Sequence, residues 1–175
     1  NNKKTFIDKS ASISSSCWID EKDVSIGAKT KIGPNSVILS GTKIGDNVTI
    51  GPNVTIGSEG FEVREFKNKI PNVPHVGGVE IKNNCNIQAN SSIAKAIFDD
   101  QTLIKENSTI AHSCFVSHGV KIGKFTKIAP GAVICGACEI GNNVWIGPNA
   151  TIKNALSIGD NSFVSIGAVV ISSVK

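Results

Sequence analysis

Aliphatic residues recur at every sixth position along most of the chain. The register holds from Ile26 to Ile56, from Ile81 to Ile93 and from Ile104 to Val170, and positions Ile7 to Ile19 extend it upstream. A surface helix would repeat its apolar stripe about every 3.6 residues and a half-buried strand about every two, so a period of six fits neither. The pattern predicts a parallel β-coil of about 24 short repeats, interrupted at two places.

Each repeat combines a short strand with a corner. The tetrapeptide Ile-Gly-Pro-Asn, which begins at Ile32, Ile50 and Ile146, places residues that tolerate tight bends directly after a branched aliphatic side chain. Four positions after the aliphatic residue stands a small side chain, such as Ser36 or Ala150. Aliphatic and small side chains are therefore predicted to share the interior of the coil.

Composition supports thin repetitive layers rather than a bulky core. Aromatic residues make up 5% of the chain, Met and Tyr are absent, and 17 of the 175 residues are Gly. We expect a single domain over residues 1–175, with loop excursions at 57–80 and 94–103. The longest apolar run, near Ala168–Ile171, is too short to cross a membrane, and no secretory signal opens the chain, so we expect a cytoplasmic protein.

The charge pattern argues against a nucleic-acid partner. The formal net charge is +4, but the 18 basic residues are scattered along the chain and Arg64 is the single arginine, whereas nucleic-acid binding would cluster them on one face. A modestly basic surface suits an anionic small molecule equally well.

Four of the five cysteines fit the interior of the coil better than metal or redox chemistry. Cys135 and Cys138 have C-x-x-C spacing, but the sequence contains no second pair of this kind. Cys17, Cys85, Cys114 and Cys138 each stand four residues after an aliphatic position, where other repeats carry Ala, Ser or Val. We therefore predict structural thiols in a reducing compartment, and no bound metal.

His118 is the residue most suited to catalysis. It occupies a corner, two residues after Val116, and the same corner 18 residues later holds Gly136. A side chain at one corner would therefore face a glycine backbone on the next coil. An imidazole beside an unobstructed backbone N–H can act as general base next to an oxyanion site, which is the requirement of acyl transfer.

The repeats resemble those of the bacterial hexapeptide-repeat superfamily. This resemblance implies a left-handed parallel β-helix, all-β, with three hexapeptides per triangular coil and about eight coils in all. It also implies a homotrimer.

Three segments resemble more closely the N-acyltransferases that act on UDP-acylglucosamine in lipopolysaccharide synthesis. They are 57–61 with 69–79, Ala96-Ile-Phe-Asp-Asp100, and His118-Gly-Val-Lys-Ile-Gly123. The resemblance implies that His118 is the general base and that Gly136 supplies the oxyanion amide. It also implies an acidic residue seven positions before the base, where this chain has Ala111.

The stretch from Phe115 to Val170 also resembles the sugar O- and N-acetyltransferases of surface-polysaccharide pathways. The two resemblances together imply an acyltransferase that moves an acetyl or other acyl group to an amine or hydroxyl of a nucleotide-linked sugar. The donor would be acyl-CoA, with acetyl-CoA as the first expectation, or an acyl carrier protein thioester.

Residues of the two interruptions, together with the histidine six positions before the base, are the predicted substrate contacts. They are Glu59, Gly60, Phe61, His75, Asp99, Asp100 and His112. Lys121, Lys124 and Lys127 are the predicted contacts to coenzyme phosphates.

Two other hypotheses about the function remain open. Asn86-Ile-Gln88 resembles a segment of the γ-type carbonic anhydrases, which share the coil and bind zinc through three histidines, but Ala94 stands where the first zinc histidine is expected. The third reading is a non-catalytic trimeric scaffold, which the missing acidic partner of His118 favours.

Overall fold

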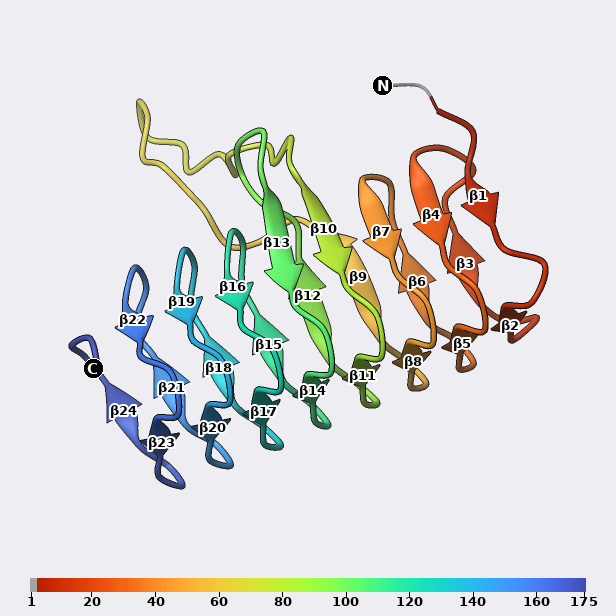
Figure 1. Ribbon diagram of the computed structural model, residues 1–175. Coiled ribbons are helices and arrows are strands. Elements are labelled where there is room, and N and C mark those ends of the chain that lie inside the picture. Colours follow the sequence, from red (N-terminus) through yellow and green to blue (C-terminus); the bar gives the residue numbers. More distant parts are fainter. Residues whose placement is uncertain (1–2) are drawn as a thin grey trace.

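The chain winds into a parallel β-helix of triangular cross-section. The computed structural model describes residues 3–175, which form 24 short strands and no helix. Each strand pairs with the strands three places before and after it, so the coil builds three parallel sheets of eight strands (Figure 1). The prediction of eight coils from 24 repeats is confirmed. Within the described residues, no helix is long and apolar enough to span a membrane.

We call the three sheets face 1, face 2 and face 3. Face 1 contains β1 (Phe6–Ile7), β4 (Val24–Ile26), β7 (Thr42–Ile44), β10 (Gly78–Ile81), β13 (Gln101–Ile104), β16 (Lys121–Ile122), β19 (Glu139–Ile140) and β22 (Ser157–Ile158). Face 2 contains β2 (Ser12–Ile13), β5 (Lys31–Ile32), β8 (Thr49–Ile50), β11 (Asn86–Ile87), β14 (Thr109–Ile110), β17 (Lys127–Ile128), β20 (Trp145–Ile146) and β23 (Phe163–Val164). Face 3 contains β3 (Trp18–Ile19), β6 (Val37–Ile38), β9 (Thr55–Ser58), β12 (Ser92–Ala94), β15 (Phe115–Val116), β18 (Val133–Ile134), β21 (Thr151–Ile152) and β24 (Val169–Val170).

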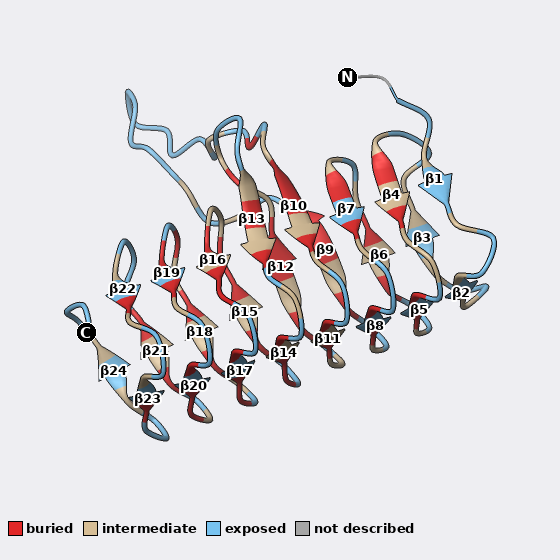
Figure 2. Cartoon of the chain, viewed as in Figure 1, coloured by how far each residue is buried: buried red, intermediate tan, exposed pale blue. Residues whose placement is uncertain are grey.

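The aliphatic position of every repeat points into the prism. Ile104 pairs with Ile122 and Ile122 with Ile140, so identical positions stack at 18-residue intervals. Along the central coils these side chains are almost fully buried, and they form one continuous hydrophobic core (Figure 2). Burial is weaker at the two ends, where Ile7 is 40% exposed and Val170 is half-buried.

The small interior position carries a second set of contacts between coils. The Thr126 hydroxyl donates to the Gly141 carbonyl at 2.8 Å and accepts the Val144 N–H at 3.2 Å, while Ser108 repeats this arrangement one coil earlier. These hydroxyls are fully buried, so each satisfies backbone groups that water cannot reach.

The cysteines at this position behave like the hydroxyls. Cys85, Cys114 and Cys138 are buried free thiols, and each Sγ lies 3.1 Å from a carbonyl oxygen of the next coil. Burial raises the pKa of the Cys85 thiol to about 11. These thiols therefore stay protonated and pack the interior rather than act as nucleophiles.

Corners need one residue with a left-handed backbone. The third residue after the aliphatic position has positive φ in most repeats, and it is commonly Asn, whose short polar side chain tolerates this region. Phe125 and Ala137 adopt it as well, with φ of 57° for both. The corner composition thus follows from backbone sterics.

Both interruptions leave the coil at the same edge of the prism, between face 3 and face 1. Ile44 pairs with Ile81 and Ile81 with Ile104, so pairing resumes in register after each insertion. The strands β9, β10 and β13 are four residues long and extend into the excursions expected at 57–80 and 94–103. We call this edge the loop edge.

Replacing Thr126 with Val should destabilise the fold while keeping its shape. The change leaves the Gly141 carbonyl and the Val144 N–H without their buried partner, which costs about 1–3 kcal/mol. Thr49→Val, on the exposed face of β8, is the matched control and should have little effect. Chemical denaturation of both variants measures the difference, and equal midpoints would contradict the role of the buried hydroxyl.

Candidate active site

His118 and Gly136 stack on each other at the loop edge. His118 lies in the corner that joins β15 on face 3 to β16 on face 1, and Gly136 occupies the same corner one coil later. A Cβ added to Gly136 would overlap Cε1 and Nε2 of the His118 ring and lie 2.9 Å from Nδ1. Only glycine leaves room for the imidazole here.

The backbone amide of Gly136 is unoccupied. Its carbonyl accepts the Ala155 N–H and the neighbouring Ala137 N–H donates to the His118 carbonyl, but no acceptor among residues 3–175 takes the Gly136 N–H. The coil therefore places a free N–H donor next to the imidazole.

The long loop folds back over His118 and brings a second histidine against it. The rings of His75 and His118 meet edge to face, with centroids 5.6 Å apart. His75 is 3% exposed, and its Nδ1 lies 2.8 Å from the Val73 carbonyl. Because a carbonyl only accepts, Nδ1 carries the proton, which leaves Nε2 to accept the Gly60 N–H at 3.2 Å. The hydrogen bonds of His75 thus fix the orientation of its ring and place a proton on Nδ1.

A carboxylate of the same loop lies beside the His118 ring. Oε2 of Glu62 is 3.9 Å from Nε2 of His118, whose side chain is only 16% exposed. Burial lowers the pKa of His118 below its ordinary 6.5, and His75 lowers it further, while the Glu62 charge opposes both. His118 is therefore a neutral imidazole near pH 7, the state that can accept a proton.

The predicted substrate residues of the long loop take different positions. Gly60 packs tightly on both imidazoles, since a Cβ there would lie 3.1 Å from His118 and 3.2 Å from His75. Glu59 braces the loop by accepting hydrogen bonds from the Asn72 amide and the His75 N–H. Phe61 is 80% exposed and faces solvent.

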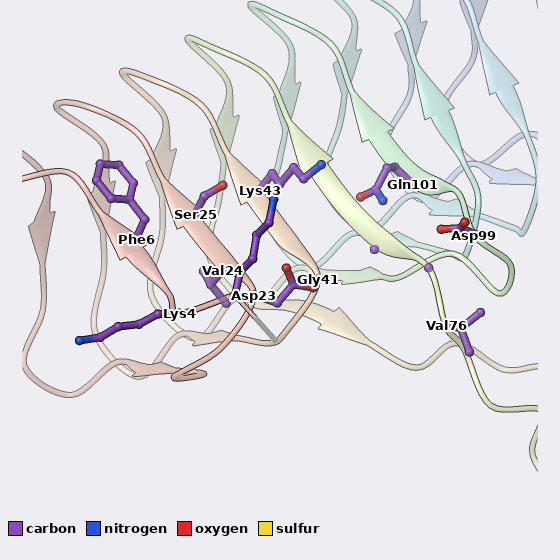
Figure 3. Close-up of a pocket in the computed structure, with 13 residues that line it drawn as sticks. Lys4, Phe6, Asp23, Val24, Ser25, Gly41, Lys43, Val76, Asp99 and Gln101 are labelled. Carbon is purple, nitrogen blue, oxygen red and sulfur yellow. The ribbon is translucent and has the colours of Figure 1, made fainter. Parts of the chain in front are cut away.

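A polar cavity of about 490 Å³ opens on face 1 next to the loop edge (Figure 3). Lys43 and Gln101 project into it, and Asp99 and Val76 line the side nearest the loops. Val76 directly follows His75, which contacts His118, so this stretch of chain separates the cavity from the imidazole pair. The structure thus places Asp99 in the cavity rather than beside His118.

The three predicted coenzyme lysines do not form a cluster within the chain. Lys121 donates to both carboxylate oxygens of Asp100, at 2.7 and 2.8 Å. Lys124, in the next corner, lies 3.6 Å from Glu106, and Lys127 is on face 2. Asp100 and Lys121 therefore neutralise each other near the loop edge, while Lys127 points from another face.

His112 is also separate from His118 within the chain. It is exposed and lies in the corner between face 2 and face 3, whereas His118 lies at the loop edge. Six residues correspond to one third of a coil, so a residue six positions earlier stands at the previous corner. The structure brings together His118, Gly136, His75 and Gly60 but leaves His112 outside this group.

Glu62 is the site residue that the repeat pattern does not reveal. It lies in the aperiodic loop, one residue after Phe61, and nothing in the six-residue register relates it to His118. Its position within an interruption of the coil was the one available signal, because loops on rigid scaffolds often carry functional side chains.

The fold and its repeats define a left-handed β-helix protein built from hexapeptides. The profile described as bacterial transferase hexapeptide (six repeats) matches residues 23–58 and 137–175. The structure is similar to UDP-N-acetylglucosamine acyltransferase from Campylobacter jejuni, with a TM-score of 0.83, 21% identity, and coverage of 98% of this chain and 67% of that one. It is also similar to LpxA from Acinetobacter baumannii, with a TM-score of 0.79, 24% identity, and coverage of 98% and 66%. These similarities confirm the predicted fold.

Curated relatives match part of the chain at higher identity. The UDP-3-O-acylglucosamine N-acyltransferase of Hahella chejuensis is 31% identical over 109 residues, which are 62% of this chain and 31% of that protein. The enzyme of the same name from Rickettsia massiliae is 36% identical over 117 residues, 67% of this chain and 30% of that protein. The matched segment therefore spans less than a third of each relative.

Gly136→Ala should push the His118 ring out of its place without unfolding the coil. The new methyl group would occupy the space of Cε1 and Nε2, so the imidazole must rotate toward solvent. Loss of burial should then raise the pKa of His118 toward its ordinary value, since burial is the largest cause of its lowering. Histidine NMR titration measures this shift.

Cys135→Ala, at the neighbouring residue, is the control because it adds no atom beside the ring. An unchanged His118 titration in Gly136→Ala would contradict the stacked geometry.

Proposed function

We propose that this chain is an acyltransferase that moves an acyl group from a thioester to an amine or hydroxyl of a nucleotide-linked sugar. The observation that carries the proposal is the stacking of the neutral His118 imidazole on the unobstructed, unoccupied amide of Gly136. His118 and Gly136 are the proposed catalytic residues.

The proposed reaction uses these two groups in one sequence. A ring nitrogen of His118 takes the proton of the acceptor amine or hydroxyl as the acceptor attacks the thioester carbonyl carbon. The resulting oxyanion accepts a hydrogen bond from the Gly136 N–H. When the tetrahedral adduct collapses, the C–S bond breaks and the protonated His118 returns its proton to the leaving thiolate.

The relatives guide the choice of substrates. Their names describe N-acylation of a UDP-acylglucosamine, and the similar structures are UDP-N-acetylglucosamine acyltransferases. We therefore infer a UDP- or dTDP-linked amino sugar as acceptor, in surface-polysaccharide or lipopolysaccharide synthesis. Acyl-CoA, with acetyl-CoA first, or an acyl carrier protein thioester is the inferred donor, and the chemistry above requires no metal.

A homotrimer assembled through face 3 is part of the proposal. The outward side chains of the face-3 strands carry no charge within the described residues, whereas face 1 presents Lys43, Glu80, Lys121 and Glu139. Face 3 ends at His118 on one edge and at the corner of His112 on the other. In such a trimer, His112 would reach a base only from a neighbouring copy.

Thiol release from acetyl-CoA and longer acyl-CoAs, with UDP- and dTDP-amino sugars as acceptors, tests the activity. We expect turnover that falls at least about 100-fold in His118→Ala, the usual cost of losing a general base. Lys31→Ala, on face 2, should retain wild-type rates. Because the pKa of His118 lies below 6.5, kcat/KM should decline with falling pH only below that value.

Absence of turnover with every donor, acyl carrier protein thioesters included, would contradict the proposal. If thioesters then also failed to bind, the hypothesis of a non-catalytic scaffold would replace the proposed acyltransferase. If the protein instead bound zinc and hydrated CO₂, the hypothesis of a γ-type carbonic anhydrase would replace the proposed acyltransferase.

Val133→Lys should disrupt the trimer. The change places a charge on face 3, in strand β18, while Thr49→Lys places the same charge on face 2. Size-exclusion chromatography with light scattering should give three times the 18.3 kDa protomer mass for the wild type and for Thr49→Lys, and a lower mass for Val133→Lys. A monomeric wild type would overturn the assembly.

A further inference from the structure

The proposed base lacks an acidic partner on the coil. Ala111 stands where the resemblance placed a carboxylate, and it lies in the corner between face 2 and face 3. A general base that becomes an imidazolium during the reaction gains from a nearby negative charge, which stabilises the protonated ring. The coil by itself does not provide that charge.

The long loop provides a carboxylate at the right place. Among residues 3–175, Glu62 is the one acidic residue within 4.0 Å of a His118 ring nitrogen, with Oε2 3.9 Å from Nε2. The Glu62 side chain is 34% exposed, so its carboxyl group stays in contact with water while it faces a ring that is largely buried. A movement of about 1 Å would bring the two atoms to the length of a charge-assisted hydrogen bond.

A chain of three hydrogen bonds holds Glu62 in this position. The Gly60 N–H donates to Nε2 of His75, Nδ1 of His75 donates to the Val73 carbonyl, and the Val73 N–H donates to the Glu62 carbonyl at 2.7 Å. The chain ties the two legs of the loop together around the buried His75 ring. The backbone of Glu62 is thereby fixed relative to the imidazole pair.

We propose that Glu62 is the positioning residue for His118, a loop-borne carboxylate that takes the place of a partner on the coil. This inference rests on the proposed function. When the ring accepts the acceptor's proton, both of its nitrogens carry N–H, and Nε2–H then faces the Glu62 carboxylate. The proton stays on the imidazole and returns to the thiolate, so Glu62 stabilises the intermediate without being protonated.

No other charge competes for this role around His118. The remaining titratable neighbour is His75, which lowers the pKa of His118 and so cannot stabilise the protonated ring. Gly60 and Gly136, which pack on the ring, have no side-chain charge. Removing the Glu62 charge therefore removes the one interaction that raises the pKa of His118.

The experiment compares Glu62→Gln, which keeps the size and removes the charge, with Glu62→Asp, which keeps the charge on a shorter side chain. Glu65→Gln is the control, because it removes a carboxylate from the same loop that has no ion pair with His118. Histidine-labelled protein is titrated by NMR without any substrate, and the His118 signal is assigned by its loss in His118→Ala. The kcat/KM–pH profile is measured in parallel.

In Glu62→Gln we expect the His118 titration and the acidic limb of kcat/KM to move to lower pH, and kcat to fall about two- to fivefold, as for a partly exposed ion pair. Glu62→Asp should recover part of both changes, and Glu65→Gln should match the wild type. A His118 titration that is unchanged in Glu62→Gln would overturn the inference even if the enzyme turns over. If the His118 titration shifts in Glu62→Gln but the wild-type protein turns over no thioester, the interaction between Glu62 and His118 is supported and the proposed function is overturned instead.

Discussion

Backbone hydrogen bonding between successive coils is the constraint on which this structure depends. Because each strand pairs in parallel with the equivalent strand of the next coil, 18 residues later where the coil is uninterrupted, as Ile104 does with Ile122, side chains of the central coils have a defined neighbour directly above and below them. Interior positions must then fit on copies of themselves, which explains the columns of Ile and the buried hydroxyls that bond to the next coil. The same stacking puts a glycine against the His118 imidazole.

The periodic part of the molecule could be predicted because the six-residue repeat determines both the local structure and the pairing of strands between coils. One six-residue unit specifies a strand, a corner and an interior side chain, and repetition leaves little choice about pairing. The contact between His118 and Gly136 followed from counting 18 residues along that register. The same counting places His112, six residues away, at a different corner of the prism.

The aperiodic part could not be predicted in this way. The approach of Glu62 to His118 depends on a loop whose shape is determined by the buried tautomer of His75 and its hydrogen bonds, not by any repeat. Likewise, sequence spacing does not show that the Lys121 ammonium group donates hydrogen bonds to both carboxylate oxygens of Asp100. Long-range polar contacts of this kind are specified by tertiary geometry, so composition and periodicity leave them open.

The loop has two opposing effects on the base, and both serve the proposed chemistry. By covering the His118 ring it favours the neutral imidazole, the form that can take a proton, while the Glu62 charge favours the imidazolium that results. A coil alone would leave the ring more hydrated and without a fixed counter-charge. An insertion at a corner can add these effects without disturbing the coil, because Ile44, Ile81 and Ile104 still pair in register around it. The rigid coil thus positions the proposed base and the proposed oxyanion donor, and the loop adjusts the proton affinity of His118.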